Sequence, residues 1–155
     1  MAHEDAFTTA LEREGAAYEV LEHERTERAA DEAAALGLPT HEVAKTIVVS
    51  TDGGNFRVVL PAAERLDLHK LRELLAAGKE LHLLSEEALA SEYAVFELGA
   101  VPPLGGPADP VVVDRRVADL DRVVLEAGRH DRSVRMTATD LVSASGARIA
   151  DVCVD

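Results

Sequence analysis

Hydrophobic positions along this chain recur with two periods, one typical of β-strands and one typical of amphipathic helices. Short β-branched and aliphatic runs bounded by turn residues predict strands over residues 17–21, 46–50, 56–60, 81–84, 111–113, 122–126, 133–136 and 148–152. Apolar positions at helical spacing predict helices over residues 4–13, 27–36, 68–77, 86–90 and 140–144. Because Asp, Gly and Asn fill positions 52–55, the strands on either side are expected to form a hairpin.

Capping residues mark the ends of several predicted helices. Thr26, Asp67 and Ser85 each precede a helical pattern and are expected to N-cap it, because their side-chain oxygens can accept hydrogen bonds from unpaired amides. Gly37 and Gly78 are expected to end the helices that begin near residues 27 and 68, since glycine adopts the left-handed conformation that stops a helix.

The order of these elements indicates the fold class. Strands run in pairs and mix with single helices, which argues against a regular βαβ series. We therefore expect an α+β fold in which a mixed, strongly bent and barrel-like sheet is flanked by helices. No internal repeat, low-complexity segment or linker interrupts the 155 residues, so a single domain over residues 1–155 is expected.

Composition narrows the class of protein. Tryptophan is absent and aromatic residues make up 3% of the chain, so the core must be aliphatic. No apolar run approaches the ~18 residues of a membrane-spanning helix, and the first residues lack the basic start of a signal peptide. The single cysteine, Cys153, excludes an internal disulfide and a cysteine-based zinc cluster. We expect a cytoplasmic protein that does not bind a membrane.

The net charge of −13 bears on the partners of the chain. Proteins that bind nucleic acids along the backbone usually carry a basic face, because neutralising phosphates supplies most of the affinity. The longest basic run here is the pair Arg115 and Arg116. Such a surface is expected to repel the body of a nucleic acid.

The segment 99–106, Gly-Ala-Val-Pro-Pro-Leu-Gly-Gly, is the most restricted part of the backbone. Pro102 and Pro103 donate no backbone hydrogen bond, and each fixes φ near about −65°. Gly99 and Gly105 permit backbone angles and close approaches that a Cβ would forbid. One interpretation is a stiff, exposed loop whose backbone receives a ligand, and the other is a rigid connection between strands.

A lysine opens the strand pattern Val-Ala-Lys-Thr-Ile-Val-Val at residues 43–49. The chain has three lysines against thirteen arginines, so Lys45 stands out as a compact, mobile ammonium at the mouth of an apolar strand. Its side chain either serves a site or extends from the strand end toward solvent.

Together these segments resemble a known family. The order EVAKTIVV, GAVPPLG, VVVD, VLEAGRHD and MTATDL is similar to the YbaK/prolyl-tRNA-synthetase-associated domain, and the resemblance runs from about Tyr18 to Leu141. Members are aminoacyl-tRNA deacylases, either free-standing or inserted in prolyl-tRNA synthetase. The resemblance implies a mixed, bent sheet flanked by helices, with a pocket beside the Pro-Pro loop.

The resemblance also implies roles for the two motifs. Lys45 would bind the ester carbonyl or the terminal phosphate and stabilise developing negative charge. Gly99 would present its backbone to the reacting ester. Five further loop residues would bind the substrate or hold that backbone rigid: Ala100, Val101, Pro102, Pro103 and Gly105.

Five residues outside the loop complete the implied site. Thr46 would donate its hydroxyl to the terminal nucleotide, or is an ordinary strand threonine. Asp114 would fix the loop or Lys45 by an ion pair, or has a purely structural role. Gly128 matches the family, and His130 would orient the attacking water or contact the adenosine, or is a turn histidine. His23 would lie at the edge of the pocket.

The chemistry expected of such a site requires neither a metal nor a cofactor. The six histidines form no closely spaced metal-binding pair, and no residue set suggests a Ser-His-Asp triad. An aminoacyl ester is already activated, so it can be hydrolysed by positioning a water and stabilising the oxyanion. An ammonium and backbone groups are sufficient for this.

The expected function is that of a free-standing aminoacyl-tRNA deacylase. Its substrate would be the 3′ end of tRNA-Pro carrying a small wrong amino acid, with prolyl-tRNA synthetase as a partner that delivers it. The specificity stays open, because Leu104 and residues 93–98 depart from better-known members. The alternative is a non-catalytic module of the same fold that binds an aminoacyl-adenosine-like ligand or a synthetase.

Overall fold

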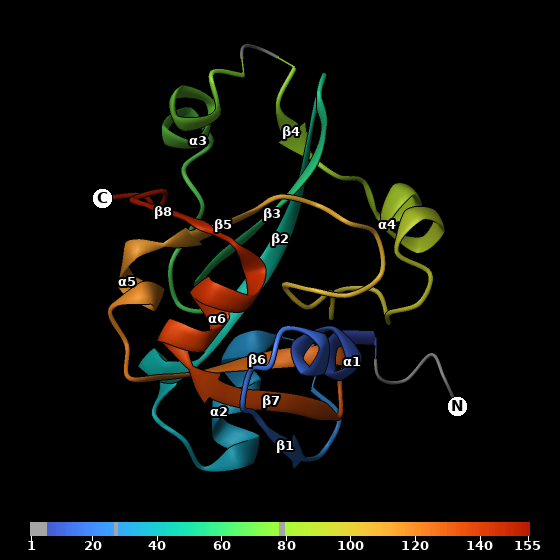
Figure 1. The fold of residues 1–155 in the computed structure, drawn as a ribbon, viewed down its shortest axis with the longest axis vertical. Helices are drawn as coiled ribbons and strands as arrows, with labels where there is room; N and C mark the ends of the chain where they lie inside the picture. Colours follow the sequence, from blue (N-terminus) through green and yellow to red (C-terminus); the bar gives the residue numbers. More distant parts are fainter. Residues whose placement is uncertain (1–5, 27, 78–79) are drawn as a thin grey trace.

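A computed structural model describes residues 6–26, 28–77 and 80–155. Helices and strands alternate irregularly along the chain and form two sheets with helices around them (Figure 1). The elements in chain order are α1 (Ala6–Arg13), β1 (Glu19–Glu22), α2 (Ala29–Leu36), the 3-10 helix η2 (Thr40–Glu42), β2 (Ala44–Thr51), β3 (Gly54–Pro61), α3 (Leu68–Leu75), β4 (His82–Leu83), α4 (Glu86–Glu92), β5 (Val111–Asp114), α5 (Arg115–Ala118), β6 (Arg122–Arg129), β7 (Arg132–Thr137), α6 (Ala138–Ser145) and β8 (Arg148–Ala150).

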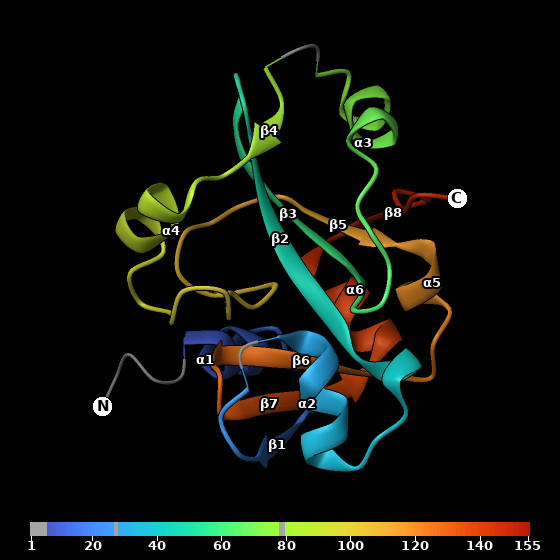
Figure 2. The ribbon, with the colours of Figure 1, turned by 180° about the vertical axis from the view of Figure 1, so that it is seen from behind.

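The larger sheet has the strand order β4-β2-β3-β5-β8, and the smaller has the order β1-β7-β6. β3 and β5 pair in parallel, as do β5 and β8, while the other pairs are antiparallel, so the larger sheet is mixed as expected. Figure 2 shows β2 as a long strand that reaches from the β4 end of the molecule down to the smaller sheet and α2. The α+β class expected from the sequence is confirmed.

The sheets do not close into a barrel. Val43 forms a single parallel bridge with Val124 of β6, and the next residue, Ala44, pairs with Pro61 of β3. The chain therefore pairs with the smaller sheet at Val43 and with the larger sheet from Ala44 onward. The sequence predicted a single bent sheet, whereas the structure has two sheets joined at this point.

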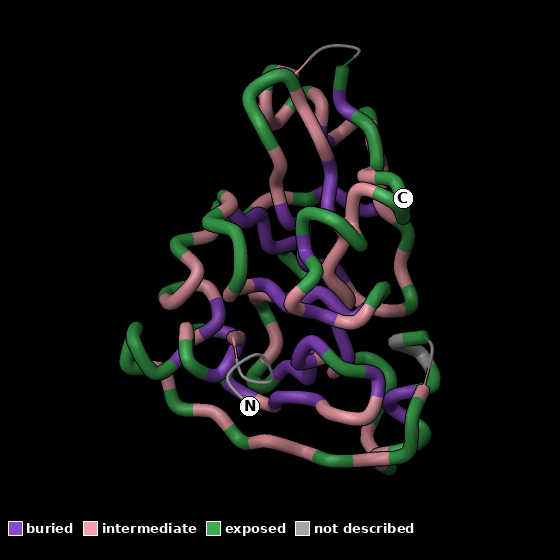
Figure 3. The backbone as a smooth tube through the Cα atoms, turned by 90° about the vertical axis from the view of Figure 1, so that its right-hand side faces the viewer, coloured by how far each residue is buried: buried purple, intermediate pink, exposed green. Residues whose placement is uncertain are grey.

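The core lies where the two sheets and their helices meet, and buried backbone runs through the middle of the molecule in Figure 3. Its largest cluster combines aliphatic side chains of β5, β6 and β7 with Phe7 and Leu11 of α1 and Leu141 of α6. Leu71 of α3 packs into a second cluster with Val49 and other strand residues. As the composition requires, these side chains are mostly aliphatic.

Two of the predicted N-caps are present and one is not. Asp67 accepts hydrogen bonds from the amides of His69 and Lys70, and Ser85 accepts one from the amide of Ala88. Thr26 does not cap α2, because the helix begins at Ala29 and residue 28 takes the cap position without a side-chain bond. The amide of Thr26 instead donates to the carbonyl of His130, which ties this segment to the end of β6.

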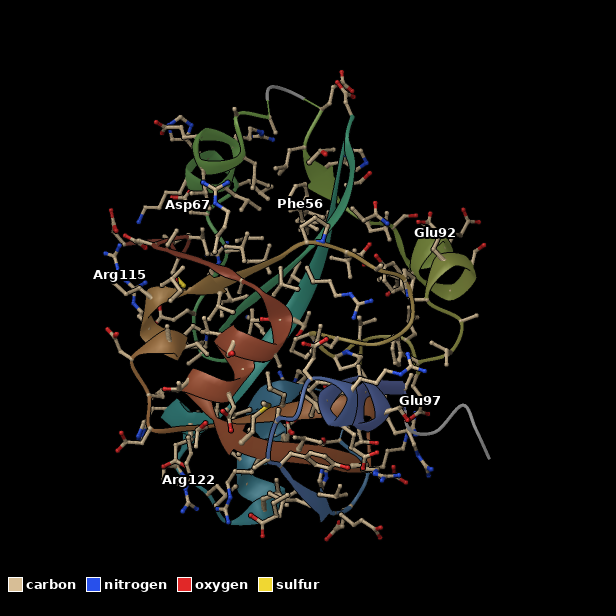
Figure 4. All side chains as sticks on the ribbon, in the orientation of Figure 1. Phe56, Asp67, Glu92, Glu97, Arg115 and Arg122 are labelled. Carbon is tan, nitrogen blue, oxygen red and sulfur yellow. The ribbon has the colours of Figure 1, made fainter. Side chains whose placement is uncertain are left out.

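Helix ends show why some boundaries were predicted better than others. Gly37 adopts a left-handed conformation and caps α2 as expected. Ala76 takes the left-handed position after α3, and Gly78 lies outside the described residues. The short helix α5 was not predicted, since four residues carry too little periodic pattern. Figure 4 shows Asp67 and Arg115 at the starts of α3 and α5.

No helix in the described part of the chain is both long and apolar enough to cross a membrane.

Candidate active site

A cavity of about 470 Å³ opens where the start of β2 meets the Pro-Pro loop and β6. Nine residues line it: Arg28, Ala44, Lys45, Thr46, Ile47, Ala62, Gly99, Val101 and Glu126. The structure thus brings together four residues predicted for the site, Lys45, Thr46, Gly99 and Val101. Arg28 and Glu126, two charged lining residues, were not predicted.

Lys45 is the second residue of β2, which is fixed by its pairing with β3 on one side. Its side chain is half-buried, and within residues 6–26, 28–77 and 80–155 its ammonium has no hydrogen-bond or ion-pair partner. Burial lowers the pKa of this ammonium, and the nearby Cys153 and Glu64 oppose that effect. An unpaired cation in a cavity is suited to bind a negatively charged or carbonyl oxygen.

The Pro-Pro loop is hydrogen-bonded to Arg57 of β3, whose side chain is 1% exposed. Its guanidinium donates to the carbonyl oxygens of Pro102 at 2.8 Å, Gly105 at 2.6 Å and Pro107 at 2.8 Å. A fourth bond, of 3.0 Å, joins it to the carboxylate of Asp109. Arg57 therefore supplies donors to three carbonyls of the loop and fixes the backbone on either side of Pro103.

Aromatic rings complete the environment of Arg57. Its guanidinium carbon lies 5.2 Å from the centre of the Tyr93 ring and 5.9 Å from that of Phe96. The Tyr93 hydroxyl donates to Asp109 at 2.6 Å. The only sequence signal for this arrangement is an arginine inside the apolar strand Phe-Arg-Val-Val-Leu.

Gly105 lies where the loop passes close to α1. Its φ is +96°, and a Cβ at this position would be 2.6 Å from the carbonyl oxygen of Ala6. Gly99 also has a positive φ, of +85°, but the nearest atom to its virtual Cβ is His130 Cε1 at 3.5 Å. Gly105 is therefore required for packing, whereas the side of Gly99 toward His130 has ordinary contact distances.

His130 is 2% exposed and does not line the cavity. Its Nε2 lies 2.7 Å from the carbonyl oxygen of Leu98, and its Nδ1 lies 3.0 Å from a carboxylate oxygen of Glu126. Its amide donates to Glu97, which Figure 4 shows at the outer edge beside the loop. Both ring nitrogens thus contact the protein and the side chain does not line the cavity, which fits the alternative of a turn histidine. A role in orienting the attacking water or contacting the adenosine stays a prediction.

Ala100 and Gly128 join the loop to the end of β6. The amide of Gly128 donates to the carbonyl of Ala100 at 3.0 Å, and the amide of Ala100 donates to the carbonyl of Glu97 at 3.0 Å. A Cβ on Gly128 would be 2.8 Å from the ring of Phe96. Neither residue lines the cavity, nor do Pro102, Pro103 and Gly105. Pro103 and Gly105 instead line a second hollow, between the loop and α1.

Asp114 has the structural role that the sequence left open. It is fully buried and accepts hydrogen bonds from the amides of Arg116 and Val152, both at 2.9 Å. Its ion pair is with the guanidinium of Arg116 at 3.4 Å. The predicted ion pair with Lys45 or the loop is therefore wrong, because Asp114 instead begins α5 and anchors the chain after β8.

His23 lies outside the cavity, at one end of a buried polar chain. Its Nε2 is 2.9 Å from the hydroxyl of Ser133, which is hydrogen-bonded to the carboxyl group of Glu32. Glu32 and Ser133 are both fully buried. Burial raises the pKa of Glu32 to about 8, and the neighbouring Glu126 contributes in the same direction. Glu32 therefore holds its proton at neutral pH.

Metal-binding groups are not assembled in residues 6–26, 28–77 and 80–155. No three His, Cys, Asp or Glu side chains of this described part lie where they could hold one ion. The arrangement can instead place one free ammonium, one carboxylate and a rigid glycine backbone around a bound group.

Comparisons with known proteins show which structures this chain is similar to. A candidate trans-editing enzyme for prolyl-tRNA synthetase has a structure 26% identical in sequence, with a TM-score of 0.86 over 96% of this chain and 94% of that one. A hypothetical protein is 27% identical, with a TM-score of 0.87 over 97% and 100% of the chains. A candidate signal transduction protein of Marinobacter aquaeolei VT8 is 25% identical, with a TM-score of 0.72 over 97% of this chain and 30% of its own.

No curated protein sequence matches the chain. The sequence model of the aminoacyl-tRNA editing domain matches residues 23–144, which contain the start of β2, the Pro-Pro loop and all of β6. This match covers well over half of the chain. The chain therefore belongs to the aminoacyl-tRNA editing domain family, which includes the YbaK proteins that its motifs resemble.

Proposed function

We propose that this protein is an aminoacyl-tRNA deacylase that hydrolyses the ester between a small mischarged amino acid and the 3′ end of its tRNA. The observation that carries the proposal is the cavity that Lys45 lines together with the loop residues Gly99 and Val101, its ammonium having no hydrogen-bond or ion-pair partner among the described residues. The family of the chain supports an editing role. The likeness to a candidate trans-editing enzyme for prolyl-tRNA synthetase favours tRNA-Pro as the tRNA.

Hydrolysis of this ester requires a stabilised oxyanion and a positioned water. The carbonyl oxygen of the ester gains negative charge as water attacks, and the half-buried ammonium of Lys45 would stabilise that charge. Holding the ester against the rigid loop at Gly99 lowers the entropic part of the barrier. Thr46 also lines the cavity and would contact the terminal ribose or base.

The cavity favours a small amino acid. Ala44, Ile47 and Val101 give its wall an aliphatic lining, and its volume is about 470 Å³. An aliphatic pocket discriminates by only about 1–3 kcal/mol for each methylene. Alanine and cysteine are therefore the substrates to test first, and the pocket alone gives graded selectivity between them.

The charge of the protein limits how the tRNA is held. With a net charge of −13, the surface offers little to neutralise the phosphates of a tRNA body. Recognition confined to the aminoacylated 3′ end agrees with a cavity whose cations are Lys45 and Arg28. Delivery of the tRNA by prolyl-tRNA synthetase would supply the remaining affinity.

The test is deacylation of a panel of tRNAs charged with alanine, cysteine, serine or proline, with wild type and two lysine variants. We expect hydrolysis of at least one mischarged tRNA-Pro, and Lys45→Met should lower kcat/KM by about 100-fold or more. Lys70→Met is the matched control, because Lys70 pairs with Asp151 and Asp155 on the surface. It should retain wild-type turnover.

Two outcomes would contradict the proposal. Equal rates for wild type and Lys45→Met would remove the ammonium from the reaction. Tight binding of an aminoacyl-adenosine analogue without turnover of any charged tRNA would favour a non-catalytic binding module, which the acidic surface also allows.

A further inference from the structure

Glu126 occupies a distinctive place in the cavity. It lies on β6, across from the start of β2, and its side chain is 9% exposed. Among the described residues that line the cavity, the charged side chains are Arg28, Lys45 and Glu126, so Glu126 supplies the one carboxylate. It shares that wall with Gly99, whose backbone is proposed to meet the ester.

His130 fixes the orientation of this carboxylate. The carbonyl of Leu98 can only accept a hydrogen bond, so Nε2 of His130 carries a proton and donates to it. Nδ1 then faces a Glu126 oxygen at 3.0 Å, and a single proton must lie between these two atoms. The imidazole is itself held by the bond from its amide to Glu97. The contact with His130 thus fixes the orientation of the Glu126 carboxyl group, which lines the cavity.

A second carboxyl group, that of Glu32, lies close to Glu126 and differs from it in its surroundings. Glu32 of α2 is fully buried close to Glu126, and burial raises its pKa to about 8. Two neighbouring carboxyl groups titrate apart, because the ionised form of one disfavours ionisation of the other. Among the described residues, Glu32 of α2 and His130 in the turn after β6 are charged or titratable groups close to Glu126, and Lys45 of β2 and Arg28 before α2 line the same cavity. Glu32 keeps its proton near neutral pH, so it cannot serve as a base there.

We propose that Glu126 is a catalytic residue that accepts the proton of the attacking water, an inference that rests on the proposed deacylase function. His130 is then a positioning residue that acts through Glu126 and Leu98. With Glu126, the site extends beyond Lys45 and the Pro-Pro loop. Glu126 supplies a proton acceptor for the water, which neither of those two features provides.

Hydrolysis of the ester begins with attack of a water on its carbonyl carbon. A water oxygen forms a bond to the ester carbonyl carbon while one of its protons moves to the Glu126 carboxylate. The carbonyl electron pair moves to its oxygen beside the Lys45 ammonium. When this intermediate collapses, the bond to the ribose oxygen breaks and the proton held by Glu126 moves to that oxygen. The products are the free amino acid and tRNA with its terminal hydroxyl restored, and Glu126 is again ionised.

Glu126→Gln tests this role, because glutamine keeps the shape and the hydrogen bond to His130 but cannot take the proton. We expect kcat to fall by about 10²–10⁴-fold, with KM changed less than about threefold. The limb of the kcat–pH profile on which wild-type activity rises with pH should be lost. Glu87→Gln, a matched change on an exposed α4 residue, should leave kcat and the profile unchanged.

Glu126→Asp provides a second variant in case glutamine prevents folding, which thermal unfolding of each variant would show. Aspartate retains a carboxylate set back by one methylene, so the pH-dependent limb should persist while kcat falls. Wild-type kcat in Glu126→Gln, or an effect on KM alone, would overturn the inference while the deacylase function stood. A wild-type protein that hydrolyses no charged tRNA would instead overturn the deacylase function, and this role of Glu126 with it.

Discussion

The guanidinium of Arg57 lies 2.8 Å from the carbonyl oxygen of Pro102, inside the protein and 45 residues away in sequence. This contact turns a proline-rich connection into a fixed wall, because the same guanidinium also binds the carbonyls of Gly105 and Pro107. The interpretation of the loop as a rigid connection therefore has a structural basis, and ligand binding by its backbone stays a prediction. The loop is rigid because a buried cation braces it, and this rigidity presents Gly99 and Val101 to the cavity.

Arg57→Lys should lower both stability and activity. Lysine keeps the charge but cannot reproduce the planar fork that reaches several acceptors, so carbonyls and Asp109 would lose their partners. Breaking a buried charged network typically costs about 3–5 kcal/mol. Urea unfolding should show a loss of this order, and kcat/KM should fall as the loop loosens. Arg148→Lys, on the exposed strand β8, is the control and should change neither. An Arg57→Lys variant of wild-type stability would show that the brace is dispensable.

The sequence indicated Lys45 as a site residue but did not indicate the role of Arg57 in holding the loop. Strand patterns located β2 and β3 to within about two residues, because alternating or continuous apolar runs report local burial directly. Lys45 and the glycines stood out because their residue types are unusual where they occur. The partners of Arg57 lie 45–52 residues away, so no local pattern reports them.

Gly105→Ala should lower mainly the thermal stability of the protein, whereas Gly99→Ala should lower mainly its deacylation activity. A Cβ at Gly105 would be 2.6 Å from the carbonyl oxygen of Ala6, so α1 must shift and thermal stability should drop clearly. At Gly99 the nearest atom is 3.5 Å away, and the cost is the positive φ of +85°, about 1–2 kcal/mol. Activity should fall more than stability there, because the methyl group would lie against the ring of His130, which contacts Glu126 of the cavity.

Calorimetry and deacylation assays on both variants would check this order. Full activity in Gly99→Ala together with a stability loss larger than that of Gly105→Ala would reverse it. The loop would then serve as a structural connection alone.

Glu32 should make the protein less stable as pH rises. Its pKa is about 8 in the folded protein against 4.5 ordinarily, so between these values the folded chain holds a proton that the unfolded chain has released. The free energy of unfolding must fall with pH across this window and level off above it. At 1.36 kcal/mol for each pKa unit, the loss is at most about 5 kcal/mol.

Glu32→Gln removes the titrating group while keeping a neutral side chain of the same shape. Its unfolding free energy, measured by urea titration from pH 5 to pH 9, should lack the decline that wild type shows, apart from effects of other groups. Glu87→Gln, exposed on α4, should retain the decline. Parallel curves for wild type and Glu32→Gln would show that Glu32 is ionised when the protein is folded.

The site was less predictable than the fold because its charged groups are sorted by tertiary packing. Glu126 sits in the strand pattern Val-Val-Leu-Glu-Ala-Gly, where a charged residue has no distinctive meaning until β6 is placed opposite Lys45. His130 was predicted for the site, yet its ring is turned to Leu98 and Glu126. The residue type indicated proton chemistry, and only the packing shows that Glu126 lines the cavity while His130 does not.

Binding of uncharged tRNA should be weak and should depend little on salt. The slope of log affinity against log salt follows the number of phosphates that basic groups neutralise, and this chain has a net charge of −13. The cavity offers Lys45 and Arg28, enough for about two phosphates of a 3′ end. Fluorescence anisotropy between about 50 and 200 mM salt would measure the slope. An aminoacylated minihelix should then be hydrolysed nearly as well as the full tRNA. Tight binding with a steep slope would reveal a basic surface that reads the tRNA body, and the minihelix would then be a poor substrate.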